Sequence, residues 1–134
     1  MAKIQMFFKA VYAGFMIGAG CIVYLSVENK LAGSLLFSFG LLTIVTQEFY
    51  LYTGKIGFVK KAWELVHMLI IIAGNYLGTL IASFASKAAR LNISSTELVI
   101  AKLDKDITSV FVLSVFCGVM MYLAIDNYNK SKNI

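Results

Sequence analysis

Residues that could carry out acid, base or metal chemistry are few and widely spaced in this chain of 134 residues. His67 is the single histidine, and Cys21 and Cys117 each lie in an apolar run. A metal site needs several such ligands close together, and the sequence has no CxxC or HExxH pattern. No nucleophile is paired with a second titratable group. The sequence therefore predicts no enzyme active site, no metal site and no cofactor, and it predicts structural roles for His67 and both cysteines.

Glu48 is an acid near the end of an apolar segment, where the chain reads Thr-Gln-Glu-Phe-Tyr-Leu-Tyr-Thr-Gly over residues 46–54. A charged residue at the centre of a membrane helix costs about 2.5–3.5 kcal/mol, so we expect Glu48 to face protein or water. Backbone groups freed by a broken helix are tolerated only where they line a cavity. Residues 48–54 thus predict a re-entrant break beside a conduction path. The alternative is an ordinary helix end, with Tyr50 and Tyr52 at the membrane interface.

The composition places these residues in a membrane protein. Hydrophobic residues make up 60% of the chain and charged residues 14%, and the mean hydropathy is +0.81. Soluble domains average about 45–50% apolar and about 25% charged residues. This composition excludes most soluble enzymes, disulfide-rich secreted scaffolds and disordered regulators. Since the net charge of +5 accompanies long apolar runs, we expect the lipid bilayer as a partner and no nucleic acid.

Four apolar stretches are long enough to cross a bilayer as helices, which requires about 20 residues. The sequence predicts a single membrane domain over residues 1–134, all-α, with four transmembrane helices, the second of them broken by the re-entrant loop. The predicted spans are 7–27, 31–53, 63–86 and 107–125, with a polar loop at 87–106.

Basic residues near the span ends predict the orientation. With the N-terminus inside, seven of the 12 Lys and Arg residues fall on the cytoplasmic side. The first apolar run is too long for the hydrophobic region of a cleaved signal peptide. We therefore expect both termini in the cytoplasm, and the absence of targeting elements fits a bacterial inner membrane.

Small residues recur every four positions in the first and third predicted spans. Such ridges let two helix backbones approach closely. They predict contact between these two helices, or simply the close packing of any helical membrane protein. The residues are Ala10, Gly14 and Gly18 in the first span and Gly74, Gly78, Ala82 and Ser86 in the third.

Several segments, taken in order, resemble the formate/nitrite transporter family. Residues 31–42 and Tyr50-Leu-Tyr-Thr-Gly look like that family's second helix and omega loop. Residues 74–80, Gly-Asn-Tyr-Leu-Gly-Thr-Leu, look like its third helix. Residues 101–103 and 117–124 look like its basic segment and fourth helix. Together these segments extend the resemblance over nearly the whole chain.

The resemblance implies an aquaporin-like fold, usually pentameric, that conducts small monovalent anions such as formate, nitrite or hydrosulfide. It implies that Thr53 guards the pore and that Leu51 is a hydrophobic constriction residue beside it. Phe37 and Leu41 match positions that help close the other constriction. Lys102 matches a vestibule lysine that lends positive potential where anions enter.

The chain also departs from the family, whose members have six helices in two inverted repeats. Counterparts of helices five and six are absent, which leaves a half-repeat plus one helix and removes the family's central histidine; His67 does not match that position. Tyr50 stands where the family has an acid, with Glu48 two residues earlier. Gly118 replaces an asparagine of the fourth helix. The family's proton-coupled mechanism is therefore not expected to carry over unchanged.

Three functions remain open. The first is a half-length component of an anion channel or transporter, whose pore is completed by self-assembly or by a partner subunit. The alternative is a non-conducting interaction or regulatory subunit that keeps the family fold. The third is an unrelated four-helix membrane protein, such as a small pore former. Because a lone chain would expose the polar break to lipid, we expect an oligomer.

Overall fold

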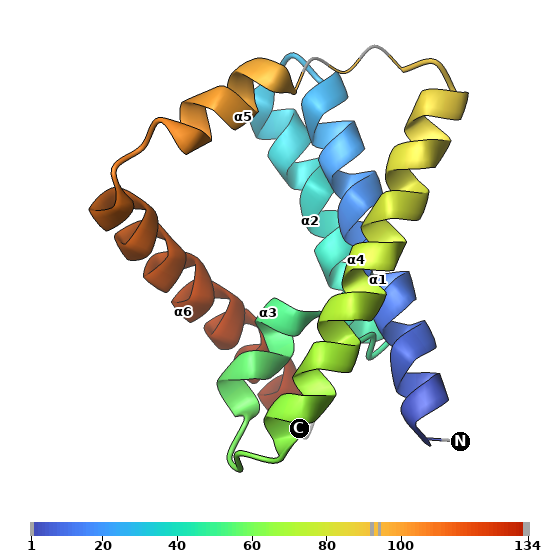
Figure 1. The fold of residues 1–134 in the computed structure, drawn as a ribbon, viewed down its shortest axis with the longest axis vertical. Helices are drawn as coiled ribbons and strands as arrows, with labels where there is room; N and C mark the ends of the chain where they lie inside the picture. Colours follow the sequence, from blue (N-terminus) through green and yellow to red (C-terminus); the bar gives the residue numbers. More distant parts are fainter. Residues whose placement is uncertain (1, 92, 94, 133–134) are drawn as a thin grey trace. The chain divides into compact units, whose positions relative to one another are not determined.

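The computed structural model describes residues 2–91, 93 and 95–132, and within these ranges the regular structure is helical (Figure 1). The chain divides into two compact units, residues 1–93 and 94–134, which we describe separately. The first unit holds α1 (Ala2–Ser26), α2 (Lys30–Thr46), α3 (Tyr52–Lys55), η1 (Ile56–Phe58) and α4 (Glu64–Ala88). The second holds α5 (Thr96–Leu103) and α6 (Ile107–Ser131).

Three helices of the described chain, α1, α4 and α6, each have 25 residues and are long and apolar enough to cross a membrane. The expectation of an integral membrane protein is thus met. Helix α2 has 17 residues, or about 26 Å at about 1.5 Å per residue, and ends at Thr46 rather than at the predicted Thr53. The polar loop predicted at 87–106 contains α5, and α6 continues to Ser131, beyond the predicted end at 125.

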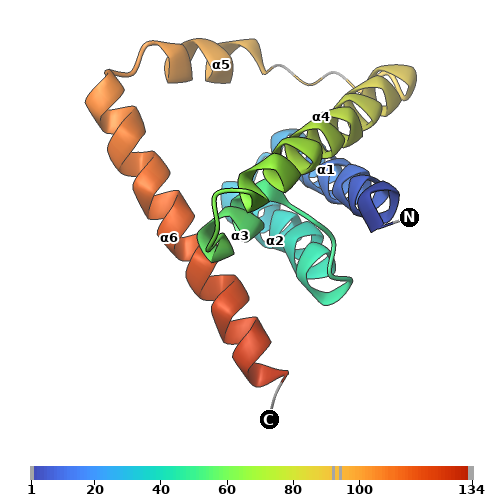
Figure 2. The same cartoon turned by 60° about the horizontal axis from the view of Figure 1, so that its bottom comes forward.

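The core of the first unit is the crossing of α1 and α4, which lie side by side in Figures 1 and 2. Apart from Ile71, the buried residues of α4 are small, and so are those of α1 that face it: Ala10, Ala13, Gly14, Gly74, Gly78 and Ala82. A Cβ atom placed on Gly74 would lie 2.6 Å from the Cβ of Ala10, and one on Gly18 would lie 2.6 Å from the Cβ of Ala82. Either would clash, so the helices approach this closely because these positions lack side chains.

Helix α2 packs against α1, and the two helices form a hairpin. Asn29 caps its start, since the Asn29 side-chain oxygen accepts hydrogen bonds from the backbone N–H groups of Leu31 at 3.0 Å and Ala32 at 3.2 Å. Gly20 of α1 receives the ring of Phe37, whose Cδ2 would lie 2.9 Å from a Cβ atom there. This contact places Phe37 against α1.

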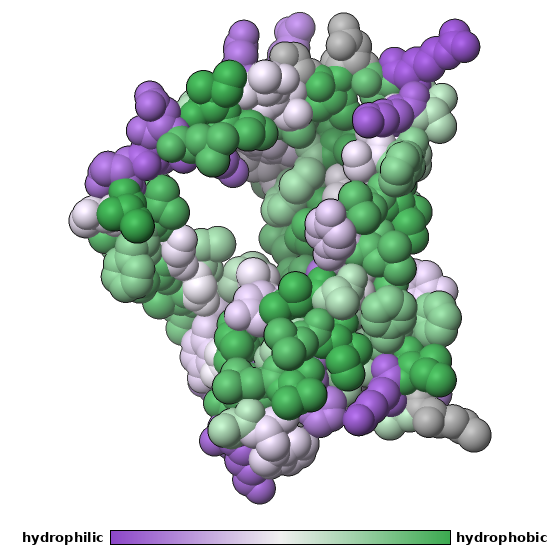
Figure 3. All heavy atoms as spheres, in the orientation of Figure 1, coloured by the Kyte–Doolittle hydropathy of each residue, from purple (hydrophilic) through white to green (hydrophobic). Residues whose placement is uncertain are grey.

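In the second unit, no residue of α5 or α6 is buried, and both helices lie wholly within the described ranges. Asp106 caps α6: its carboxylate accepts hydrogen bonds from the Ser109 hydroxyl at 2.7 Å and from the Ser109 N–H at 3.0 Å. These bonds lower the pKa of Asp106. Figure 3 shows that most of the visible surface is hydrophobic and that the strongly hydrophilic residues lie mainly near the ends of helices.

Candidate functional site

The candidate site is the break, residues 47–55, which runs from the end of α2 through α3. Helix α2 ends in a Schellman motif, in which Phe49 N–H donates to the Ile44 carbonyl at 2.9 Å and Glu48 N–H donates to the Val45 carbonyl at 3.2 Å. Glu48 occupies the left-handed position of this motif, with φ of 55°, where glycine is usual. The exposed Glu48 therefore terminates α2 through its backbone.

The termination turns the chain toward α1. Ile44, whose carbonyl accepts a hydrogen bond in this motif, is only 3% exposed, so the end of α2 is fixed by a packed apolar residue. The ring of Phe49 stacks on Tyr12 of α1, with ring centroids 5.6 Å apart. The Tyr50 N–H donates a hydrogen bond to the Lys9 carbonyl of α1 at 3.4 Å. The first half of the break is thus attached to α1.

Asn75, near the middle of α4, holds the second half. Its amide nitrogen donates to the Tyr50 carbonyl and to the Ala10 carbonyl of α1, each at 2.8 Å. Its amide oxygen accepts from the Tyr52 N–H at 2.9 Å. Two carbonyls and one N–H surround the amide, so only one orientation satisfies all three bonds. One side chain thereby joins α1, α4 and the break.

Two cations lie over Tyr50. The ammonium of Lys55 lies 4.8 Å from the ring centroid and that of Lys9 lies 5.6 Å away, both within cation–π range. Lys55 is half-buried and interacts electrostatically with Glu48 and with Lys9. Lys9, Lys55 and Glu48 together give this region a net charge of +1 beside a polar backbone.

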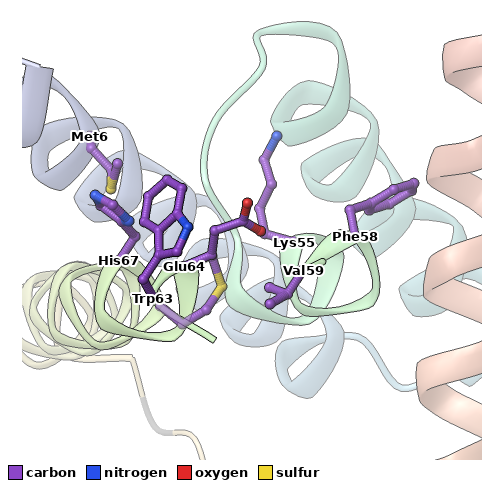
Figure 4. Close-up of a pocket in the computed structure, with 8 residues that line it drawn as sticks. Met6, Lys55, Phe58, Val59, Trp63, Glu64 and His67 are labelled. Atoms are coloured by element: carbon purple, nitrogen blue, oxygen red, sulfur yellow. The ribbon is translucent and has the colours of Figure 1, made fainter. Parts of the chain in front are cut away.

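A pocket of about 270 Å³ opens beside the break, between α1, the α3–η1 segment and the start of α4 (Figure 4). The rings of Trp63 and His67 meet edge to face there, with centroids 5.5 Å apart. Glu64 caps the turn before α4, since its carboxylate accepts from the Lys60 N–H at 3.0 Å. The Lys55 side chain extends away from the two rings in Figure 4. Over the described part of the chain, no three His, Cys, Asp or Glu residues are grouped to hold a metal ion.

The other predicted site residues are distributed over three elements. Leu51 is half-buried and precedes α3, and Thr53 is exposed within α3. Phe37 and Leu41 are half-buried, one turn apart on α2. Lys102 is exposed in the last turn of α5, in the second unit. The structure thus brings Leu51 and Thr53 together in the break.

The sequence analysis missed Asn75 as a site residue. The available signal was its position: an amide in the middle of a long apolar helix needs hydrogen-bond partners inside the protein. It also missed Lys9, because a lysine near the start of an apolar span suggests only an interfacial residue. The sequence position of Asn75 or of Lys9 does not show that either residue contacts the break.

Three long apolar helices define this protein as a helical integral membrane protein. The sequence matches the formate/nitrite transporter family over residues 1–134, and the chain belongs to that family. The resemblance found from the sequence is thereby confirmed, and the family is one of transporters. No curated protein and no solved structure matches the chain.

Proposed function

We propose that this chain contributes one wall of a conduction path for small monovalent anions, with formate, nitrite and hydrosulfide as the candidate substrates. The observation that carries the proposal is the break itself: the backbone is non-helical at residues 47–51, and Tyr50 there and Tyr52 at the start of α3 are bonded to Asn75, in a member of the formate/nitrite transporter family. Irregular backbone in a membrane protein is expected where it lines a water-filled cavity.

The charges and apolar side chains near the break support an anion path. Lys9 and Lys55 lie at Tyr50, and a cation at a water-filled funnel raises the local concentration of anions. Lys102 would do the same at a vestibule. Apolar constrictions exclude fully hydrated ions, and we assign this role to Leu51 on the break and to Phe37 with Leu41 on α2.

We further propose that α2 and the break together form the fourth span, in an aquaporin-like arrangement. Helix α2 is shorter than a hydrocarbon core of about 30 Å, so a re-entrant break would complete the crossing. Further helices would close the path, supplied by other copies of this chain, as in the family's pentamers, or by a partner subunit. The membrane would be a bacterial inner membrane, with both termini in the cytoplasm.

Formate and nitrite flux into liposomes that hold only the purified protein tests the proposal. Thr53 is exposed on the break, so Thr53→Trp should plug the path and lower the flux at least tenfold without removing a charge. Thr108→Trp is the control, because Thr108 is exposed in the first turn of α6. Folded wild-type protein without flux would contradict a path that the chain forms by self-assembly and would favour the alternative of a non-conducting subunit.

A further inference from the structure

Two of the three hydrogen bonds of the Asn75 side chain go to the residues on either side of Leu51. The amide donates to the carbonyl of the residue before it, Tyr50, and accepts from the N–H of the residue after it, Tyr52. An amide side chain in this position substitutes for a neighbouring peptide strand. Leu51 between these bonds is extended, with φ of −91° and ψ of 128°, directly before α3 begins.

The same amide is fixed to a rigid frame. Its third bond goes to Ala10, which is fully buried in the crossing of α1 and α4. Gly14, one turn along α1, faces the backbone of Asn75 so closely that a Cβ atom there would overlap the Asn75 carbonyl. The position of Asn75 relative to α1 is therefore set by backbone packing, which leaves its side chain little freedom to move.

We infer that Asn75 is the positioning residue that fixes the backbone of Leu51, and that it thereby sets the size of the anion that passes the break. The inference rests on the proposed function in so far as Leu51 lines the path. Without the amide, the Tyr50 carbonyl and the Tyr52 N–H lose their partner, and the break is free to adopt other conformations. An apolar constriction that moves discriminates less between a small anion and a larger one.

Amide hydrogen exchange tests the positioning role without requiring transport. In Asn75→Leu, which keeps a side chain of similar size, we expect the Tyr52 amide to exchange at least tenfold faster, while amides of α1 and α4 keep their protection. Thr79→Val is the matched control, because Thr79 lies one turn further along α4 and its hydroxyl bonds only within that helix, to the Tyr76 carbonyl at 2.8 Å. Unchanged exchange at Tyr52 in a folded Asn75→Leu protein would overturn the inference.

If Asn75→Leu fails to fold, Asn75→Ala replaces it. Alanine offers neither an acceptor to the Tyr52 N–H nor a donor to the Tyr50 and Ala10 carbonyls, so the same local increase in exchange is expected.

Anion selectivity tests the second half of the inference. In liposomes we expect the permeability ratio of formate to acetate to fall at least threefold in the Asn75 variant and to stay unchanged in Thr79→Val. A faster Tyr52 amide with an unchanged ratio would overturn the link to selectivity. Absence of wild-type flux would count against the proposed function alone, because the exchange experiment would still decide whether Asn75 positions Leu51.

Discussion

Gly78 in α4 and Gly118 in α6 are both glycines within long apolar helices, and their surroundings are opposite. A Cβ atom on Gly78 would overlap the Val11 carbonyl of α1, whereas one on Gly118 would meet no atom of its own unit within 4 Å. The difference lies in the pattern around them, since Gly78 has small residues four positions away on both sides and Gly118 does not. In these two helices, the glycine within a repeat of small residues lies in a helix contact, and the glycine outside such a repeat does not.

The two units differ in the same way. The first is held by backbone approach and by Asn75, while α5 and α6 have no buried residue and depend on local bonds such as the Asp106 cap. The comparison yields three predictions, in decreasing order of expected effect.

Gly78→Ala should have the largest effect, because the added methyl group overlaps backbone that cannot rotate away. Overpacking of a core typically costs about 1–3 kcal/mol, and a clash with backbone lies at the upper end, so we expect a loss of about 3 kcal/mol. Thermal unfolding in detergent measures it. Gly118→Ala is the matched control and should be neutral or slightly stabilising, as alanine is a better helix former than glycine. If Gly78→Ala and Gly118→Ala lost the same amount of stability, close backbone packing would not distinguish the first unit from the second.

Glu48→Gly should have an intermediate effect and should be stabilising. A non-glycine residue in the left-handed region is strained by about 1–2 kcal/mol, and the entropy of glycine offsets part of the relief, which leaves about 1 kcal/mol. Arg90, with φ of 53°, occupies the equivalent position at the end of α4, where Leu91 N–H donates to the Ser86 carbonyl at 3.1 Å.

Arg90→Gly is therefore the control for Glu48→Gly, and denaturant titration of both variants measures the gain. Because Glu48 also interacts electrostatically with Lys55, we expect the gain at Glu48 to be the smaller of the two. A loss of stability at Glu48 with a gain at Arg90 would show that the carboxylate contributes more than the backbone strain costs.

These positions indicate how far the fold could be predicted. The long helices were predictable because a run of about 20 apolar residues crosses a bilayer as a helix. The ridges of small residues predicted which faces of two of these helices are in contact. The end of α2 was not predictable to the residue. The left-handed residue that ends α2 is a glutamate. A glycine usually marks such an end, but the next glycine in the sequence, Gly54, lies further along the chain, inside the break.

The candidate site was predictable only in part. Residue types showed that a polar, aromatic segment interrupts the second apolar run, and that segment is the break. The partner of the break could not be predicted, because the hydrogen bonds of Asn75 join residues 23, 25 and 65 positions apart. Helix α5 was not predicted because it is short: Val99, Ile100 and Leu103 share one face, but eight residues within a polar segment are too few for this stripe to indicate a helix.

The smallest predicted effect is local and concerns the start of α6. The Ser109 hydroxyl and N–H lower the pKa of Asp106 in the folded protein, so the cap contributes stability above the pKa of an unfolded aspartate and loses it as the pH falls through the folded value. We expect the Ser109 amide to lose its protection in acid, measured by hydrogen exchange against Asp106→Asn, which caps without titrating. If α6 instead depended on packing, as α4 does, the wild type and this variant would show the same pH dependence.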